Sequence, residues 1–131
     1  FCVSCAGNPV GSDKVDYFVV AGGGGGTGNN GGGGVGGGAG AGGFRLSNSV
    51  GCIPAPTMSP LANPSGLSVP ATAYPITVGG GGAGGVGTPG APFCGYPGSQ
   101  GASSIFSTIT SAGGGRADAG NAITYGGGFC C

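Results

Sequence analysis

The side chains best suited to chemistry in this chain are cysteines, because the sequence has no histidine and few acidic residues. Cys2 and Cys5 form a C-x-x-C pair, a spacing used in redox and zinc sites. No βαβ pattern and no helix N-terminus accompanies the pair to lower a thiol pKa. Zinc needs four tetrahedral ligands, and the adjacent Cys130 and Cys131 are poorly placed to complete such a set. We therefore expect structural disulfides, with no metal and no cofactor.

The disulfide pairing is only partly suggested by position. Cys52 and Cys94 each follow a glycine-rich tract and lie in a proline-rich loop, so we predict that they pair. The remaining cysteines lie at the two ends of the chain: Cys2, Cys5, Cys130 and Cys131. These four could tie the termini of one chain together or link one subunit to the next, and both alternatives stay open. Disulfides of either kind indicate an oxidising, extracellular setting.

Two further short features have chemical interpretations. Arg116, Ala117 and Asp118 resemble an integrin-binding tripeptide, but in a glycine-rich segment we interpret them as a solvated charge pair. No Gly-Lys-Ser/Thr sequence follows any glycine tract, so the phosphate-binding loop is absent. Tyr96 is the best candidate for a recognition aromatic. We predict no catalytic residues and no enzymatic activity.

Composition excludes several other classes of protein. The 131 residues include 38 glycines and 10 prolines, with only three basic and three acidic side chains. A zero net charge lacks the basic footprint of a nucleic-acid binder, and no run of apolar residues is long enough to enter a membrane. Disordered chains combine low hydrophobicity with high charge. This chain has almost no charge and a mean hydropathy of +0.28, so we expect it to be ordered.

Short segments rich in β-branched and aromatic residues alternate with the glycine tracts and predict strands. They are residues 15–21, 71–78, 103–111 and, more weakly, 121–125. In the third segment Ile105 and Ile109 would share one face and Phe106 the other. We expect no α-helix, because no segment has a 3.6-residue apolar period and glycine disfavours helix.

The glycine tracts need a structure that offsets the entropy cost of ordering them. Glycine fills 16 of 22 positions in residues 22–43 and 8 of 12 in residues 79–90. Polyproline-II geometry has three residues per turn and no internal hydrogen bonds, so glycine helices of this type could pair side by side. A flexible linker is the alternative. We predict a mostly β or irregular fold, in which short strands alternate with packed polyglycine-II tracts and disulfides act as staples.

The chain is predicted to form a single domain over residues 1–131. Cysteine-bearing arms at 1–14 and 116–131 flank a core at 15–115. Proline-rich loops at 47–70 and 88–101 should lie on the surface, where recognition often takes place. We expect Phe18, Phe44 and Phe106 to form a small core that closes the ends of the glycine layer.

The order of the segments resembles the glycine-rich domain of bacteriophage tail-fibre and tail-tip, adhesin-like proteins. The resemblance rests on four pieces in the same order: DYFVVAGGGGG at 16–26, GGGGVGGGAGAGGFR at 31–45, AYPITVGGGGAGG at 73–85 and SSIFSTITSAGGG at 103–115. It covers roughly three-quarters of the chain, and the cysteine-bearing ends depart from it. The resemblance implies a virion structural or receptor-binding component with packed polyglycine-II helices and variable loops.

We therefore expect a non-enzymatic structural protein of an extracellular fibre or virion surface. Its partners would be further copies of itself and a cell-surface receptor bound through the loops, with no nucleic acid and no membrane insertion. The alternative is a self-assembling filament subunit, polymerised head to tail through the terminal cysteines. A weaker alternative is an ice-binding protein, although runs of four and five glycines break the regular Gly-x-x repeat that it would need.

Overall fold

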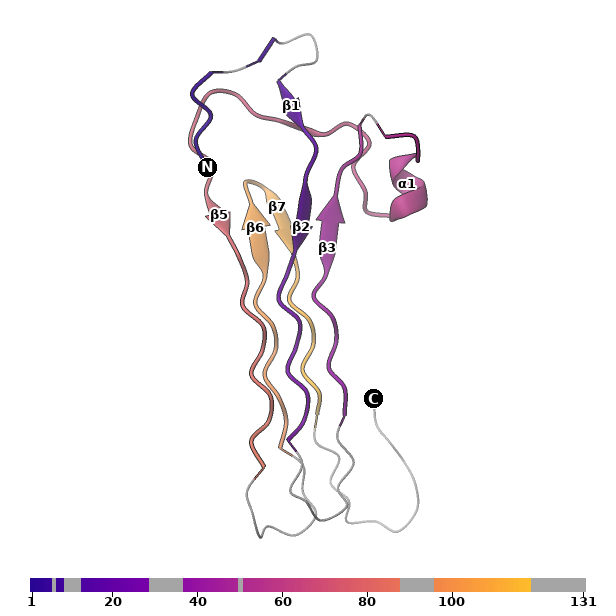
Figure 1. Cartoon of the computed structure of the whole chain (residues 1–131), viewed down its shortest axis with the longest axis vertical. Coiled ribbons are helices and arrows are strands. Elements are labelled where there is room, and N and C mark those ends of the chain that lie inside the picture. The colour runs from indigo at the N-terminus through magenta and orange to yellow at the C-terminus, as the bar shows by residue number, and fades with distance from the viewer. Residues whose placement is uncertain (6, 9–12, 29–36, 50, 88–95, 119–131) are drawn as a thin grey trace.

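The strands lie at one end of the molecule, and extended glycine tracts run from them to the other end (Figure 1). The computed structural model describes residues 1–5, 7–8, 13–28, 37–49, 51–87 and 96–118. Its elements are β1 (Lys14–Val15), β2 (Phe18–Val20), β3 (Phe44–Leu46), α1 (Ala55–Met58), β4 (Leu67–Ser68), β5 (Ile76–Thr77), β6 (Ser104–Phe106) and β7 (Ile109–Ser111). The described part of the chain is therefore mostly β and irregular, as predicted.

Two small sheets face each other at the strand end. β2 and β3 pair antiparallel, and β5, β6 and β7 form a second antiparallel sheet in that order. β6 and β7 contact β2, and β7 also contacts β3. Small side chains fill the narrow space between the sheets: Ser111 is fully buried and its hydroxyl donates to the Val19 carbonyl at 2.7 Å. The core is therefore thin, and hydrogen bonds cross it.

Beyond the strands, the backbone continues as five tracts at residues 21–28, 37–43, 79–87, 96–102 and 112–118. The tract at 21–28, here called the central tract, is hydrogen-bonded to each of the other four. Its donors repeat every three residues. Ala21, Gly24 and Thr27 donate to Gly43, Gly40 and Gly37, while Gly22, Gly25 and Gly28 donate to Ala102, Ser99 and Tyr96.

The acceptors of the central tract follow the same period of three. Gly82 and Gly85 donate to the carbonyls of Gly23 and Gly26, and Gly114 and Ala117 donate to those of Gly22 and Gly25. The tract at 96–102 also bonds to 79–87 and 112–118, and 112–118 bonds to 37–43. The described tracts thus form two rows. Tracts 79–87, 21–28 and 37–43 make a three-tract row, which lies on a two-tract row of 96–102 and 112–118.

Residues 47–70 are folded against the strand end. β4 pairs with β1, and Asn63 donates through its backbone to the Leu46 carbonyl at 2.9 Å. The segment also contains α1, a single turn that the expectation of no helix did not include. Pro56 occupies one of its first positions, where the missing N–H is not needed and the fixed φ favours a helical turn.

The strand predictions need three corrections. Residues 103–111 form a hairpin, because Ser107 (φ 53°) and Thr108 turn the chain between β6 and β7. Segments 15–21 and 71–78 contribute only short pieces, β1 and β2 in one and β5 in the other. The sequence did not predict β3 or β4. Segment 121–125 lies outside the described residues.

The predicted aromatic core is wrong for two of its three members. Phe18 is 68% exposed and Phe44 is 42% exposed, and their rings contact each other on an outer face. Phe106 packs instead with Phe1 and Tyr74, at ring-centroid distances of 6.3 and 6.1 Å. Tyr74 is the buried member of this cluster. Its backbone exchanges hydrogen bonds with Phe1, which brings the N-terminal segment against β5 and β6.

Candidate interaction surface

An apolar groove lies at the strand end of the molecule, where β2 leads into the central tract and β5 leads into the 79–87 tract. The two tracts are bonded directly, with Gly82 donating to Gly23 at 2.8 Å. β2 and β5, which precede them in the chain, belong to different sheets and are not bonded to each other. Glycine backbones can approach closely, whereas the strands carry side chains, and Val19 and Ile76 are among those that line the groove. The end of the glycine sequence therefore creates the groove.

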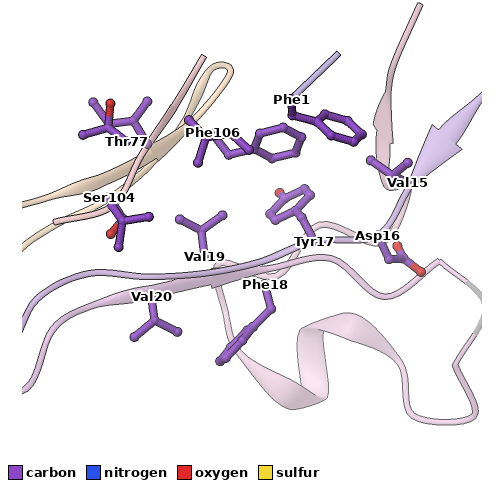
Figure 2. A pocket seen from close by; sticks show the side chains of 13 residues that line it. Phe1, Val15, Asp16, Tyr17, Phe18, Val19, Val20, Thr77, Ser104 and Phe106 are labelled. Carbon is purple, nitrogen blue, oxygen red and sulfur yellow. The ribbon is translucent and has the colours of Figure 1, made fainter. Parts of the chain in front are cut away.

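The groove has a volume of about 510 Å³ and is predominantly apolar. Figure 2 shows that Phe1 and Phe106 lie on one side of it, facing Tyr17 and Val19 of the β2 segment. The residues that line it are Phe1, Val15, Asp16, Tyr17, Phe18, Val19, Val20, Ile76, Thr77, Val78, Ser104, Ile105 and Phe106.

Phe18 and Val20 also border the groove, but they lie on the side of β2 away from Tyr17 and Val19 (Figure 2) and belong to an exposed apolar patch. Phe44, which is opposite Val20 across the β2–β3 pair, extends the patch on one flank. Ile76 and the 82%-exposed Val78 line the same groove from the β5 segment. Exposed apolar side chains that cluster in this way mark interaction sites more often than scattered ones do. We call these five residues the apolar patch.

The outer surface of the three-tract row continues from the patch and has almost no side chains. Gly23 and Gly26 of the central tract point away from the second row, since a Cβ there would have no neighbour closer than 3.4 Å. Gly81 and Gly84 have similar room, and nothing lies within 4 Å of a Cβ at Gly38. These residues follow the patch at intervals of three: Val20, Gly23 and Gly26; Val78, Gly81 and Gly84; Phe44, Ala41 and Gly38. We call this surface the glycine face.

Asp16 holds the strand end together electrostatically. Its carboxylate accepts hydrogen bonds from the Ser47 hydroxyl at 2.9 Å and from the backbone N–H and hydroxyl of Ser49 at 3.0 Å each. The Ser49 backbone N–H is the main reason that the pKa of Asp16 lies below its ordinary value. Partial desolvation acts in the opposite direction, and both serine hydroxyls reinforce the lowering. Asp16 thereby fixes the chain that leaves β3 to the chain that enters β2.

Comparison with known proteins gives one family. The model of the glycine-rich domain family matches residues 5–129. The chain belongs to this family. No curated protein and no solved structure matches it.

The cysteines of this glycine-rich domain are only partly described. Cys2, Cys5 and Cys52 are exposed, and no disulfide joins them to one another. Cys2 forms a β-bridge with Ala73, and Cys52 precedes α1 at the strand end. The predicted partners Cys94, Cys130 and Cys131 lie outside the described residues, so every proposed pairing stays a prediction. Within the described residues, no cluster of three or more metal-ligating side chains occurs.

The second predicted loop is in part a tract. Residues 96–101 belong to the two-tract row, and residues 88–95 lie outside the described part of the chain. Tyr96 is half-buried and its backbone pairs with Gly28 at the end of the row, far from the strands. Hydrogen bonds to the neighbouring tracts fix this segment. The loop prediction did not consider such bonds. Arg116 and Asp118 form an exposed ion pair at 3.0 Å, consistent with a solvated charge pair.

The first predicted loop, 47–70, does present side chains outward. Ile53, Met58 and Leu61 are all exposed large apolar residues on this segment. Figure 1 places α1 at the opposite end of the molecule from the far ends of the tracts. In the described residues, no helix is long and apolar enough to cross a membrane.

Sequence reasoning missed the apolar patch and the glycine face. The signal for the face was available, because Val20, Gly23 and Gly26 lie three apart, as do Val78, Gly81 and Gly84. The patch could not be found this way. Whether Phe18 packs inward or outward depends on which strands pair, and the sequence does not state that.

Proposed function

We propose that this chain is a non-enzymatic structural protein, a rigid module of an extracellular fibre whose glycine tracts pack as polyglycine-II helices. The observation that carries the proposal is the hydrogen bonding of the central tract, which pairs with four neighbours at a period of three residues. Three residues per turn is the period of the polyproline-II helix. A β-strand would instead alternate with a period of two.

Close packing of the tracts explains the need for glycine. A Cβ on Gly25 would overlap the carbonyl oxygen of Ala83, and one on Gly24 would overlap that of Gly115. Any side chain at these positions would push the tracts apart and break the bonds between them. The glycine content is therefore a requirement of the packing, and such packing supports a mechanical role.

A fibre of the phage tail type is the form of this role that the sequence resemblance favours. The 47–70 segment would then serve for recognition, because it is anchored through Asp16 and Asn63 yet presents Ile53, Met58 and Leu61 to solvent. Apolar side chains on an anchored segment can bind a receptor without a large loss of conformational entropy. We assign the fibre to the cell exterior or a virion surface.

A self-assembling filament subunit is the second candidate. Its support is the exposure of the Cys2 and Cys5 thiols near the strand end, where another copy could reach them. Disulfides from these cysteines to Cys130 or Cys131 of the next copy would form a head-to-tail chain.

Electron microscopy of the purified chain, with and without reductant, separates the two candidates. A fibre module gives discrete, elongated particles of constant size under both conditions. Long filaments that break up on reduction would support the filament subunit, and compact spherical particles or an unfolded chain would refute both.

A further inference from the structure

We propose that the glycine face and the apolar patch together form the contact between two copies of this chain. The proposal rests on the proposed function, since it needs the tracts to be ordered. It names the surface through which the module associates.

The described tracts surround the central tract incompletely. Its four partners cover it on the side of the two-tract row and on both flanks, but tracts 37–43 and 79–87 are not bonded to each other across its outer side. On this side, the N–H groups of Gly23 and Gly26 have no acceptor among the described residues. Every other N–H in the central tract, from 21 to 28, donates to a neighbouring tract.

These two donors have a regular spacing along the central tract. Gly23 and Gly26 are three residues apart, which is the interval at which the tracts bond to one another within the molecule. A partner must therefore offer acceptors at that interval and a backbone without bulky side chains. The tracts of a second copy meet both requirements.

The two rows differ in the side chains that they expose. The described tracts of the two-tract row include exposed polar side chains: Ser99, Gln100, Arg116 and Asp118. The glycine face has none, and its only side chain beyond hydrogen is the methyl group of Ala41. A surface of backbone donors without bulky side chains lets a second backbone approach closely enough to supply the acceptors.

The glycine face is continuous with the apolar patch. Val20, Val78 and Phe44 stand at the strand end of the three columns of the glycine face, and Phe18 packs against Phe44 at 6.0 Å between ring centroids. A two-fold axis parallel to the tracts would place the patch of one copy on the patch of the other and join the glycine faces beside it. Such a contact is isologous, with the same surface used twice.

Sedimentation of the full chain in reductant, which removes any disulfide-linked species, tests this contact. The wild type should form a dimer. Gly81→Glu adds a charge to the glycine face, and because the contact is isologous each dimer carries the charge twice. The dissociation constant of the dimer should therefore rise by roughly tenfold or more. Gly80→Glu is the matched control. A Cβ there meets nothing within 4 Å, and it lies on the outer edge of tract 79–87, so the dimer should persist.

A wild-type chain that stays monomeric would overturn the proposal, as would equal dissociation of the two variants. A monomer that sediments with ice crystals or with phosphatidylcholine vesicles would overturn it as well and identify a different occupant. Thermal unfolding distinguishes this failure from failure of the proposed function. A monomer that unfolds cooperatively leaves the rigid module intact, whereas a chain without a cooperative transition contradicts the packed tracts themselves.

Discussion

The amide of Gly25 donates to the carbonyl oxygen of Ser99 at 2.8 Å, across two tracts that are 74 positions apart in the sequence. Gly25 is buried, and its own carbonyl accepts from Ala117 of a third tract. A residue that contacts three tracts at once has no room for a side chain. This arrangement turns glycine, ordinarily the most flexible residue, into the most constrained part of the molecule.

Gly25→Ala should destabilise the fold by about 3 kcal/mol or more, at the upper end of the cost of overpacking a core. The added methyl group would overlap the carbonyl oxygen of Ala83. Neither group can rotate away, because each is attached directly to the backbone. Urea unfolding of the variant and the wild type measures the difference.

Gly23→Ala is the matched control, because its Cβ would lie 3.7 Å from its nearest neighbour. At protein concentrations below dimer formation, it should leave stability unchanged or raise it by about 0.4–1 kcal/mol through the unfolded chain. Equal destabilisation by the two variants would contradict the packing of the central tract.

Asp16→Asn should remove part of the pH dependence of stability. The hydrogen bonds from Ser49 and Ser47 lower the pKa of Asp16 in the folded state below the ordinary value of 3.8. A depressed carboxyl pKa stabilises the fold above the unfolded pKa, and this stabilisation is lost as the pH falls through 3.8 toward the folded pKa. Unfolding temperatures of wild type and variant should therefore converge in acid. Ser49→Ala should act in the same direction, and an unchanged acid profile in both variants would refute this role for Asp16.

Phe106→Ala should cost about 1–3 kcal/mol, because Phe106 packs with Phe1 and Tyr74 in a half-buried cluster. Phe18→Ala should cost less than about 1 kcal/mol in the monomer, since the side chain is largely exposed. Chemical denaturation at low protein concentration compares them. A larger loss of stability for Phe18→Ala than for Phe106→Ala would instead support the aromatic core that the sequence predicted.

Ser111→Ala should cost about 1 kcal/mol, because the fully buried hydroxyl bonds the Val19 carbonyl between the two sheets. Ser103→Ala makes the same chemical change beside β6 at a side chain that has no hydrogen bond among the described residues. Thermal unfolding should separate the two, and an equal effect would mean that the Ser111 bond contributes nothing to stability.

The alternation of short strands and glycine tracts could be predicted from the sequence because each β-rich segment ends at a glycine run. Strand pairing could not. Segment 103–111 keeps its alternation through Ser107, so nothing local distinguishes one strand from a hairpin. The segments that contain β3 and β4 have no run of β-branched or aromatic residues. They form strands because they pair with β2 and β1. The outward position of Phe18 depends on pairing between Phe18 and Leu46, which are 28 positions apart.

The candidate surface was predictable only in its period. Val20, Gly23 and Gly26 lie three residues apart in the sequence, as the period of the tract requires. Which of the three sets of residues on the tract remains exposed depends on the positions of the four other tracts. Local propensity carries no information about that choice.

Amide hydrogen exchange along the central tract tests the account most directly. In the Gly81→Glu variant, which should be monomeric, the amides of Gly24 and Gly25 should exchange slowly because they donate to Gly40 and Ser99. Those of Gly23 and Gly26 should exchange quickly, since they have no acceptor among the described residues. Two slow amides followed by one fast amide would support a packed bundle with a three-residue period. Uniformly fast exchange from Gly22 to Gly26 would mean a flexible linker and would contradict the account.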